Sequence, residues 1–286
     1  MKLDFSSEKK IKKKKTRAFI ISFSAFVLVL GTISLLMFMK SINFDFKNLM
    51  PDTSEKTTEA ESQTKAPNQS VSGSANIIIV CTDSKNNLFS LSFINCNMDN
   101  MKIRLLQLPT DEAVEVDGSM QTFNDICSKN GNDALKKAVS TFTGLTVDKI
   151  IKVKDTELKK IVAQTGDVTV DIPNSVDYKS DDFSLLLDAG SQSLTSDMFC
   201  KYLKYCDTEQ KGTAFTSYLN TLLSVENIPS QDKLFNFLVN NSTTDISIVD
   251  YTNVSAAITD YIQRKTDASV LKISDKTQLI EVTNEN

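Results

Sequence analysis

Residues 76–84 read Asn-Ile-Ile-Ile-Val-Cys-Thr-Asp-Ser, and this stretch decides the fold. The run Asn76–Val80 is rich in β-branched residues, which is typical of a strand covered on both faces. Cys81–Ser84 then turns polar, as at the exit from a strand into a loop. We therefore expect a central strand here, and a folded domain that begins at this point.

Downstream of this strand, strand and helix patterns alternate along the chain. Leu88–Asn95 and Met101–Leu108 read as a hairpin, because turn-forming Asn97–Asn100 separates them. In the helix pattern that follows, Asn132 or Asp133 is a plausible cap and Gly144 the end. The predicted helices are residues 133–142, 155–164, 195–205, 214–223, 231–240 and 254–264, with further strands at 149–153 and 168–172. This rhythm predicts an α/β fold with a mixed central sheet and helices on both faces.

The N-terminal region has a different composition. Residues 1–17 are rich in lysine, and residues 18–39 form an uncharged apolar run long enough to span a bilayer. Residues 40–75 read as a flexible linker, and residues 76–286 as an extracellular domain whose part after about 227 matches no motif. A cleaved signal peptide is the alternative, but its apolar region would be about 7–15 residues long. We expect a single-pass protein of the cell membrane with a cytoplasmic N-terminus, and we assign the lysines to topology and not to nucleic-acid binding.

Composition excludes several kinds of chemistry. The chain has no histidine, which rules out Ser-His-Asp and Cys-His catalysis. It also contains no glycine-rich phosphate loop. Five cysteines lack metal-site spacing, and we expect most to be buried free thiols, with Cys200 and Cys206 as a pair that could form a disulfide.

The order of segments resembles the LytR-CpsA-Psr (LCP) family of cell-envelope proteins. Residues 76–84 are similar to the family's N-I-L-L-L-G-x-D-S, and residues 106–111 to its S-I-P-R-D. Residues 165–173 resemble L-G-G-V-x-V-x-V-P, and residues 187–195 resemble L-x-x-G-x-x-x-L-x-G. The resemblance in layout covers about residues 9–225.

This resemblance implies an LCP-like fold and Mg²⁺-dependent transfer of a glycopolymer from a polyprenyl-pyrophosphate carrier onto peptidoglycan. Family members clamp the pyrophosphate with several arginines and hold the metal with aspartates. The corresponding residues here are Asp111, Lys204 and Lys211 for catalysis, Lys85 and Thr110 for substrate binding, and Asp83 for the metal. For an isolated loop aspartate such as Asp83 or Asp111, the alternative is a turn or cap residue.

The sequence departs from the family at the arginines. Thr110 replaces the arginine of P-R-D, and the family's Y-x-R-x-R pair falls on Lys204 and Cys206. After residue 76 only Arg104 and Arg264 remain, and Arg104, in mid-strand, is expected on a solvated sheet face. Lysine lacks the planar bidentate fork of arginine, so the clamp of the family cannot be built.

Two functions follow from these observations. The favoured one is a catalytically degenerate protein whose apolar cleft binds a polyprenyl (pyro)phosphate lipid or an envelope partner; it needs no cofactor. The alternative is an active phosphotransferase that uses Mg²⁺. Its partners in either case are the membrane and a polyprenyl-linked glycan or peptidoglycan, with no nucleic acid. Four aromatic residues are candidates for the cleft lining or for plain core packing: Phe123, Phe142, Phe183 and Phe199.

Overall fold

The structure, a computed structural model, describes residues 74–97, 101–264 and 270–280. All of them belong to one unit, Pro67–Asn286. The predicted basic tail and transmembrane segment, and the predicted linker up to residue 73, lie outside the described residues. Among the residues that are described, no helix is long and apolar enough to cross a membrane.

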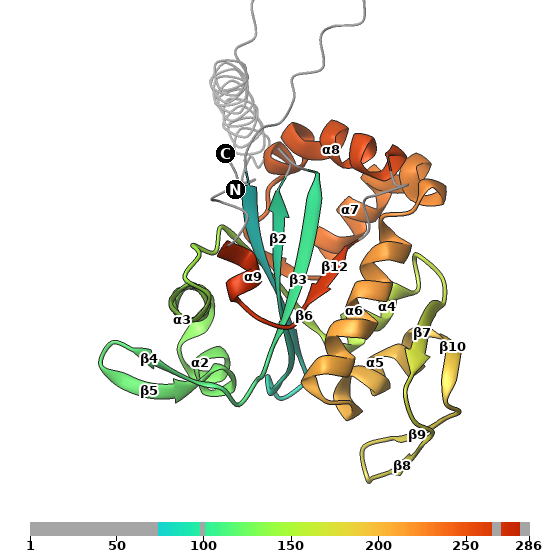
Figure 1. The fold of residues 1–286 in the computed structure, drawn as a ribbon, viewed down its shortest axis with the longest axis horizontal. Helices are drawn as coiled ribbons and strands as arrows, with labels where there is room; N and C mark the ends of the chain where they lie inside the picture. The colour runs from blue at the N-terminus through green and yellow to red at the C-terminus, as the bar shows by residue number, and fades with distance from the viewer. Residues whose placement is uncertain (1–73, 98–100, 265–269, 281–286) are drawn as a thin grey trace, which may run out of the picture. The chain divides into compact units, whose positions relative to one another are not determined.

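A mixed six-stranded sheet forms the centre of the domain, as the sequence predicted (Figure 1). Residues 74–82 pair antiparallel with the first strand of the predicted hairpin, whose two strands pair antiparallel with each other. After a crossover, residues 149–154 pair parallel with residues 74–82 on their other side. In sheet order the strands are β11 (Thr243–Thr244), β6 (Lys149–Lys154), β1 (Ser74–Thr82), β2 (Leu88–Asn97), β3 (Lys102–Leu108) and β12 (Leu271–Ile273). Since β1, β3 and β6 run in the same direction, their ends meet at one end of the sheet, which we call the carboxyl rim.

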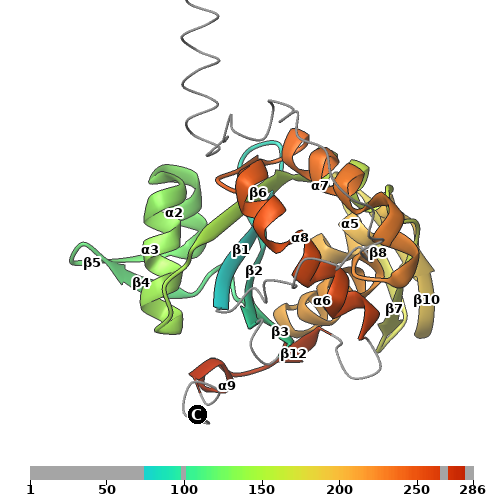
Figure 2. The ribbon, with the colours of Figure 1, turned by 90° about the horizontal axis from the view of Figure 1, so that it is seen from above.

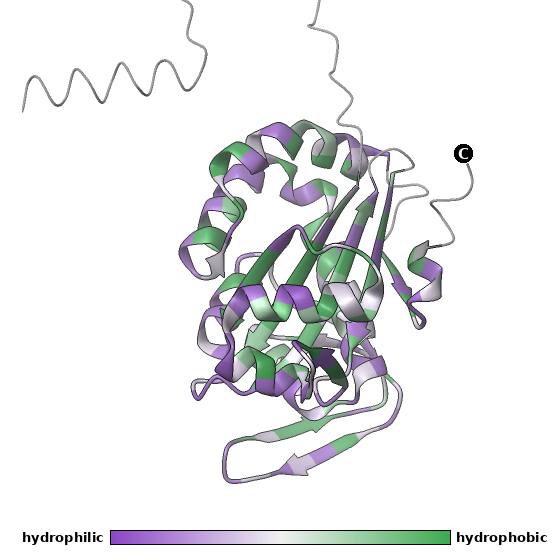
Figure 3. Cartoon of the chain, turned by 90° about the vertical axis from the view of Figure 1, so that its left-hand side faces the viewer, coloured by the Kyte–Doolittle hydropathy of each residue, from purple (hydrophilic) through white to green (hydrophobic). Residues whose placement is uncertain are grey.

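Helices cover both faces of this sheet (Figure 2). Successive side chains of a strand point to opposite faces, so Ile78 and Val80 enter one hydrophobic cluster and Cys81 enters the other. One face carries α2 (Phe123–Lys129) and α3 (Gly131–Thr143), and the other carries α4 (Asp155–Val162), α5 (Ser196–Tyr205) and α6 (Thr208–Leu222). Figure 3 shows the largely hydrophobic strands between these two layers.

Three two-stranded antiparallel sheets and a C-terminal helical layer complete the described part. The small sheets are β4–β5 (Ala113–Val116, Ser119–Thr122), β7–β10 (Val168–Ile172, Gly190–Leu194) and β8–β9 (Val176–Lys179, Ser184–Leu187). The helical layer is the 3-10 helix η2 (Val225–Ser230), α7 (Gln231–Asn240) and α8 (Ile248–Gln263), followed by the short α9 (Thr277–Ile280).

Two helices begin earlier than the apolar spacing predicts, because their caps lie upstream. Asp207 caps α6 by accepting a hydrogen bond from the Gln210 amide, so the helix runs through Gly212. Ser247 and Asp250 form a capping box that starts α8 at Ile248. The predicted termination of α3 at Gly144 is confirmed, with this glycine in the left-handed conformation at φ 75°.

The expectation for Arg104 was wrong: its side chain is buried, with only 7% of the residue exposed. The reason is β12, whose Leu271 pairs with Arg104 and turns β3 from an outer strand into an interior one. Asn95 of β2 pairs with Arg104 of β3, and its side-chain amide donates to the Asn76 side chain. The Nη1 of Arg104 is buried without a hydrogen-bond partner.

Candidate functional site

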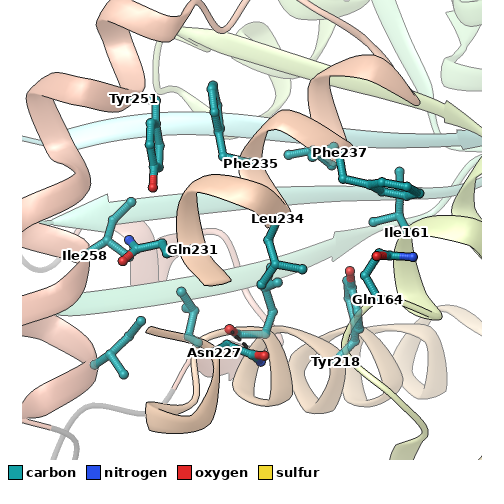
Figure 4. Close-up of a pocket in the computed structure, with 14 residues that line it drawn as sticks. Ile161, Gln164, Tyr218, Asn227, Gln231, Leu234, Phe235, Phe237, Tyr251 and Ile258 are labelled. Carbon is teal, nitrogen blue, oxygen red and sulfur yellow. Dashed lines mark hydrogen bonds between the residues drawn. The ribbon is translucent and has the colours of Figure 1, made fainter. Parts of the chain in front are cut away.

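An apolar cavity of about 320 Å³ lies between the sheet and the helical layer. A second cavity of about 170 Å³ opens beside it, under α7 (Figure 4). The two cavities adjoin each other, because they share lining residues from α4, α6, α7 and α8. These shared residues are Ile161, Tyr218, Leu222, Leu223, Leu238 and Ile258.

The sequence of each lining element explains why the space stays open. Ile77 and Ile79 of β1 point into it at the two-residue spacing of a strand. From the other side, α7 carries Leu234, Phe235, Phe237 and Leu238, yet none of its residues is fully buried. Its apolar face therefore borders the cavity instead of closing a solid core.

The four phenylalanines predicted for the cleft do not line either cavity. Phe123 and Phe142 pack edge to face at 5.7 Å in the cluster on the opposite face of the sheet. Phe199 is fully buried in the core, 6.1 Å from Phe215 between ring centroids, and Phe183 packs on Tyr178. Side-chain type alone could not assign these rings, since a core position and a cavity wall demand the same hydrophobicity. The core alternative is correct for Phe123 and Phe199, whereas Phe183 is half-buried and Phe142 is half-buried beside another cavity, next to Pro109 and Lys276.

At the carboxyl rim, one ammonium group pairs with one carboxylate and acts electrostatically on a second. Lys204 of α5 places its Nζ 2.5 Å from Asp155, the residue that follows β6. The same Nζ lies 5.4 Å from the centre of the Phe89 ring, within cation–π range. Lys204 also lowers the pKa of Asp83, which follows the neighbouring strand β1. The rim thus brings together Asp83 and Lys204, two of the predicted site residues.

Asp83 is anchored in its own turn. One carboxylate oxygen accepts the backbone amides of Lys85 and Asn87, and the other accepts the Asn87 side-chain amide, each at 2.8 Å. Partial burial raises the pKa of Asp83, but these hydrogen bonds and Lys204 outweigh it, so the pKa is below its ordinary value. This geometry supports the turn role that the sequence offered as the alternative.

The donor set at the rim does not make a metal cage by itself. In the described ranges, no group of three or more acidic or thiol side chains is arranged to hold a metal ion. Both oxygens of Asp83 already accept N–H groups, and Asp155 accepts Lys204. Mg²⁺ usually binds one or two carboxylates together with substrate phosphates, so here the phosphate oxygens of a ligand would have to supply much of the coordination.

The remaining predicted site residues lie in nearby loops and helices. The Thr110 carbonyl accepts the Asn124 amide, and the Asn124 side chain accepts the Leu88 amide, which ties the loop after β3 to the start of β2. Asp111 follows in this loop and is exposed. Lys85 is exposed in the Asp83 turn.

Lys211 sits in α6 and acts on a different group. Burial raises the pKa of Cys206 to about 12, and the charge of Lys211 opposes this rise. The charge of Lys211 thus acts on the Cys206 thiol, whereas the charge of Lys204 acts on the Asp83 carboxylate. Of the predicted lysine side chains, Lys204 of α5 is therefore the one whose charge acts on Asp83.

Sequence reasoning missed Asp155 and Phe89 as parts of the rim. The available signal for Asp155 was its position: it follows β6 as Asp83 follows β1, and Thr82 pairs with Lys154 in parallel register. Neither described arginine joins this group, because Arg104 is buried within the sheet and Arg264 pairs with Asp260 in α8.

Comparisons with known proteins agree with this architecture. The curated polyisoprenyl-teichoic acid–peptidoglycan teichoic acid transferase TagV of Bacillus subtilis (strain 168) is 23% identical over 202 residues, or 65% of this chain. The match spans 52%, about half, of that relative's length.

Solved structures share the fold. The crystal structure of B. subtilis TagV aligns with a TM-score of 0.60 at 20% identity, covering 73% of this chain and 94% of that one. A putative transcription regulator from Eubacterium siraeum DSM 15702 gives 0.63 at 18% identity, covering 78% and 89%. A structure of TagT bound to LIIa-WTA gives 0.55 at 16%, covering 74% and 89%. The profile of the LytR_cpsA_psr family matches residues 43–282, and the chain belongs to this family.

Proposed function

We propose that this protein is a membrane-anchored cell-envelope member of the family that binds a polyprenyl phosphate or pyrophosphate lipid and has lost the transfer reaction. The observations that carry the proposal are the two adjoining apolar cavities under the helical layer and a carboxyl rim at which Lys204 pairs with Asp155 and neither described arginine takes part. The cavity suits an isoprenoid chain, because its walls are built from aliphatic and aromatic side chains. At the rim, Lys204 is the cation that a phosphate head group would contact, in competition with Asp155.

The same rim argues against efficient transfer. Phosphoryl transfer relies on cations that stabilise charge as it develops on the phosphate oxygens. Lys204 is already neutralised by Asp155 at 2.5 Å, and a phosphate must compete with that carboxylate. A lysine also lacks the bidentate geometry of a guanidinium group, so binding is favoured over catalysis.

One observation favours the alternative, an active Mg²⁺-dependent phosphotransferase. Asp111 is exposed in the loop after β3 and, among the described residues, has no hydrogen-bond or ion-pair partner for its side chain. A carboxylate in that state is available to a metal that arrives with a pyrophosphate, or to an acceptor hydroxyl. The head-group transfer named for the TagV relative would then persist in this chain.

The test is a paired measurement on the purified full chain in detergent. Binding of a polyprenyl-pyrophosphate glycan is measured in the same preparation as its transfer to peptidoglycan or hydrolysis, with and without Mg²⁺. We expect binding without turnover, and equal binding in Asp111→Ala. Metal-dependent turnover that disappears in Asp111→Ala would establish the active enzyme, and absence of binding would reject both functions.

A further inference from the structure

Two adjacent aliphatic side chains are exposed at the start of α8. Ile248 is 58% exposed and Val249 63%, and among the described large hydrophobic residues they are the only exposed pair that is adjacent in sequence. Thr252, Asn253 and Ala256 continue the exposed surface along the next turns, at the spacing of one side of a helix. These five residues, which we call the α8 face, carry no charge. An uncharged surface with two exposed aliphatic side chains is typical of a contact site.

The α8 face lies at the end of the sheet where β1, β3 and β6 begin, which we call the amino rim. After β11, Asp245 accepts the backbone amide of Ile150, so the chain leads back along β6 toward its first residue. That residue, Lys149, donates from its Nζ to Asp250 of α8 at 2.9 Å and pairs with Ile77 of β1. The first turn of α8 is thus fixed beside the start of β1. Figure 1 shows α8 at this end of the sheet and β8 and β9 toward the other end.

The larger apolar cavity extends to the amino rim. Its lining includes Ala75 and Ile77 at the start of β1, and Val254 and Ile258 of α8. Ala75 is exposed and Val254 is half-buried, so the cavity comes close to the surface between these two residues. The α8 face and this end of the cavity therefore belong to the same stretch of one helix.

The surface that the amino rim would meet is a lipid bilayer. The described domain begins at Ser74, the first residue of β1, and the predicted transmembrane segment lies upstream of it, at residues 18–39. β1 has 9 residues, which at about 3.3 Å per residue puts the carboxyl rim about 30 Å farther from this attachment point. Lys102, exposed as the first residue of β3, adds a positive charge at the amino rim, which suits anionic lipids.

We infer that the amino rim rests on the membrane, with Ile248 and Val249 inserted among the lipid head groups and the cavity end at Ala75 and Val254 turned toward the bilayer. Aliphatic side chains on one side of a helix bind at the boundary between head groups and acyl chains. A polyprenyl chain would then pass from the bilayer into the cavity without exposing its apolar carbons to water. The inference rests on the proposed function, which supplies the membrane anchor and the lipid ligand.

The test uses the absence of tryptophan from the chain, because a single introduced tryptophan then reports only its own surroundings. The full chain with Val249→Trp is reconstituted into vesicles of phosphatidylglycerol and phosphatidylethanolamine, with or without brominated acyl chains, which quench tryptophan on contact. We expect the brominated lipid to lower the emission about twofold. Leu186→Trp is the matched control, since Leu186 is 74% exposed in β9, and its emission should not change. Adding Ile248→Glu to the Val249→Trp chain should restore the emission, because a carboxylate avoids the apolar layer yet is favourable in the first turn of a helix.

Equal quenching of Val249→Trp and Leu186→Trp, or quenching that persists with Ile248→Glu, would overturn the membrane contact. A dimer in detergent that Ile248→Glu disperses would overturn it too, and would assign the α8 face to a second copy of the chain. Binding of a fluorescent polyprenyl phosphate in detergent tests the proposed function separately, because no bilayer is present. There Ile248→Glu should bind like the wild type, whereas it should take up the lipid from vesicles about three- to tenfold more slowly. If the wild type does not bind in detergent, the proposed function fails, and the quenching still decides whether the amino rim lies on the membrane.

Discussion

Enlarging a cavity-lining residue should separate lipid binding from stability. Ile258 of α8 is half-buried and lines both parts of the apolar space. Ile258→Phe adds about three carbon atoms, which would displace two or three methylene equivalents of a bound chain, worth about 2 kcal/mol or roughly 30-fold in affinity. Because the added atoms enter empty space, the free energy of unfolding should change by less than about 1 kcal/mol.

The matched control is the same substitution on the packed face of the sheet. Ile78 of β1 is fully buried in the cluster under α3 and lines neither of the two apolar cavities. Ile78→Phe should therefore lower the free energy of unfolding by about 1–3 kcal/mol, the usual cost of overpacking, while the folded fraction binds lipid normally. Both quantities are read on the full chain in one detergent, by denaturant unfolding followed with circular dichroism and by competition with a fluorescent polyprenyl phosphate. The reasoning is refuted if Ile258→Phe destabilises as much as Ile78→Phe and binds lipid like the wild type.

Three further outcomes follow from the structure. The Asp250 carboxylate accepts a hydrogen bond from the Lys149 ammonium group at 2.9 Å, and this ion pair lowers the pKa of Asp250 to about 2. The pair therefore stabilises the fold above about pH 4, and this stabilisation is lost as the pH falls toward 2. Asp250→Asn should flatten that part of the pH dependence of unfolding, measured by chemical denaturation at several pH values. Gly212→Ala would put a Cβ 3.1 Å from the Cβ of Gln107, whose amide is fixed by hydrogen bonds, so we expect a net loss of about 1 kcal/mol in thermal unfolding despite the helix propensity of alanine. All five thiols are free and only Cys96 is not fully buried, so mass spectrometry should find a thiol reagent on Cys96 alone before unfolding and on all five in denaturant.

The sequence predicts the sheet better than the site. β1, β2, β3 and β6 follow from apolar runs bounded by turn residues, and each lies within two residues of its predicted range. The short strands β11 and β12 show no such pattern, because an alternation of apolar and polar residues cannot be recognised in two or three residues. That gap is why the burial of Arg104 was not foreseen.

At the site, local sequence identified the loops but not their contacts. Asp83 was recognisable at the exit of β1, whereas its pairing with the Asn87 amide depends on the shape of the turn. The contact between Lys204 and Asp155 joins residues far apart in the chain and depends on how α5 packs. The expectation of buried free thiols is confirmed, and the disulfide between Cys200 and Cys206 is not formed.

The parallel pairing of β12 with β3 has a consequence for the order in which the chain folds. Synthesis proceeds from the N-terminus, so β1, β2 and β3 are complete long before Leu271–Ile273 exist. Until then the outer side of β3 has unpaired backbone groups, the arrangement that invites two nascent chains to join strand to strand. Residues Leu271–Ile273 thus protect the open edge of β3 from pairing with another chain. Truncation before residue 271 should therefore cause aggregation during synthesis, even though the lipid cavity is unchanged.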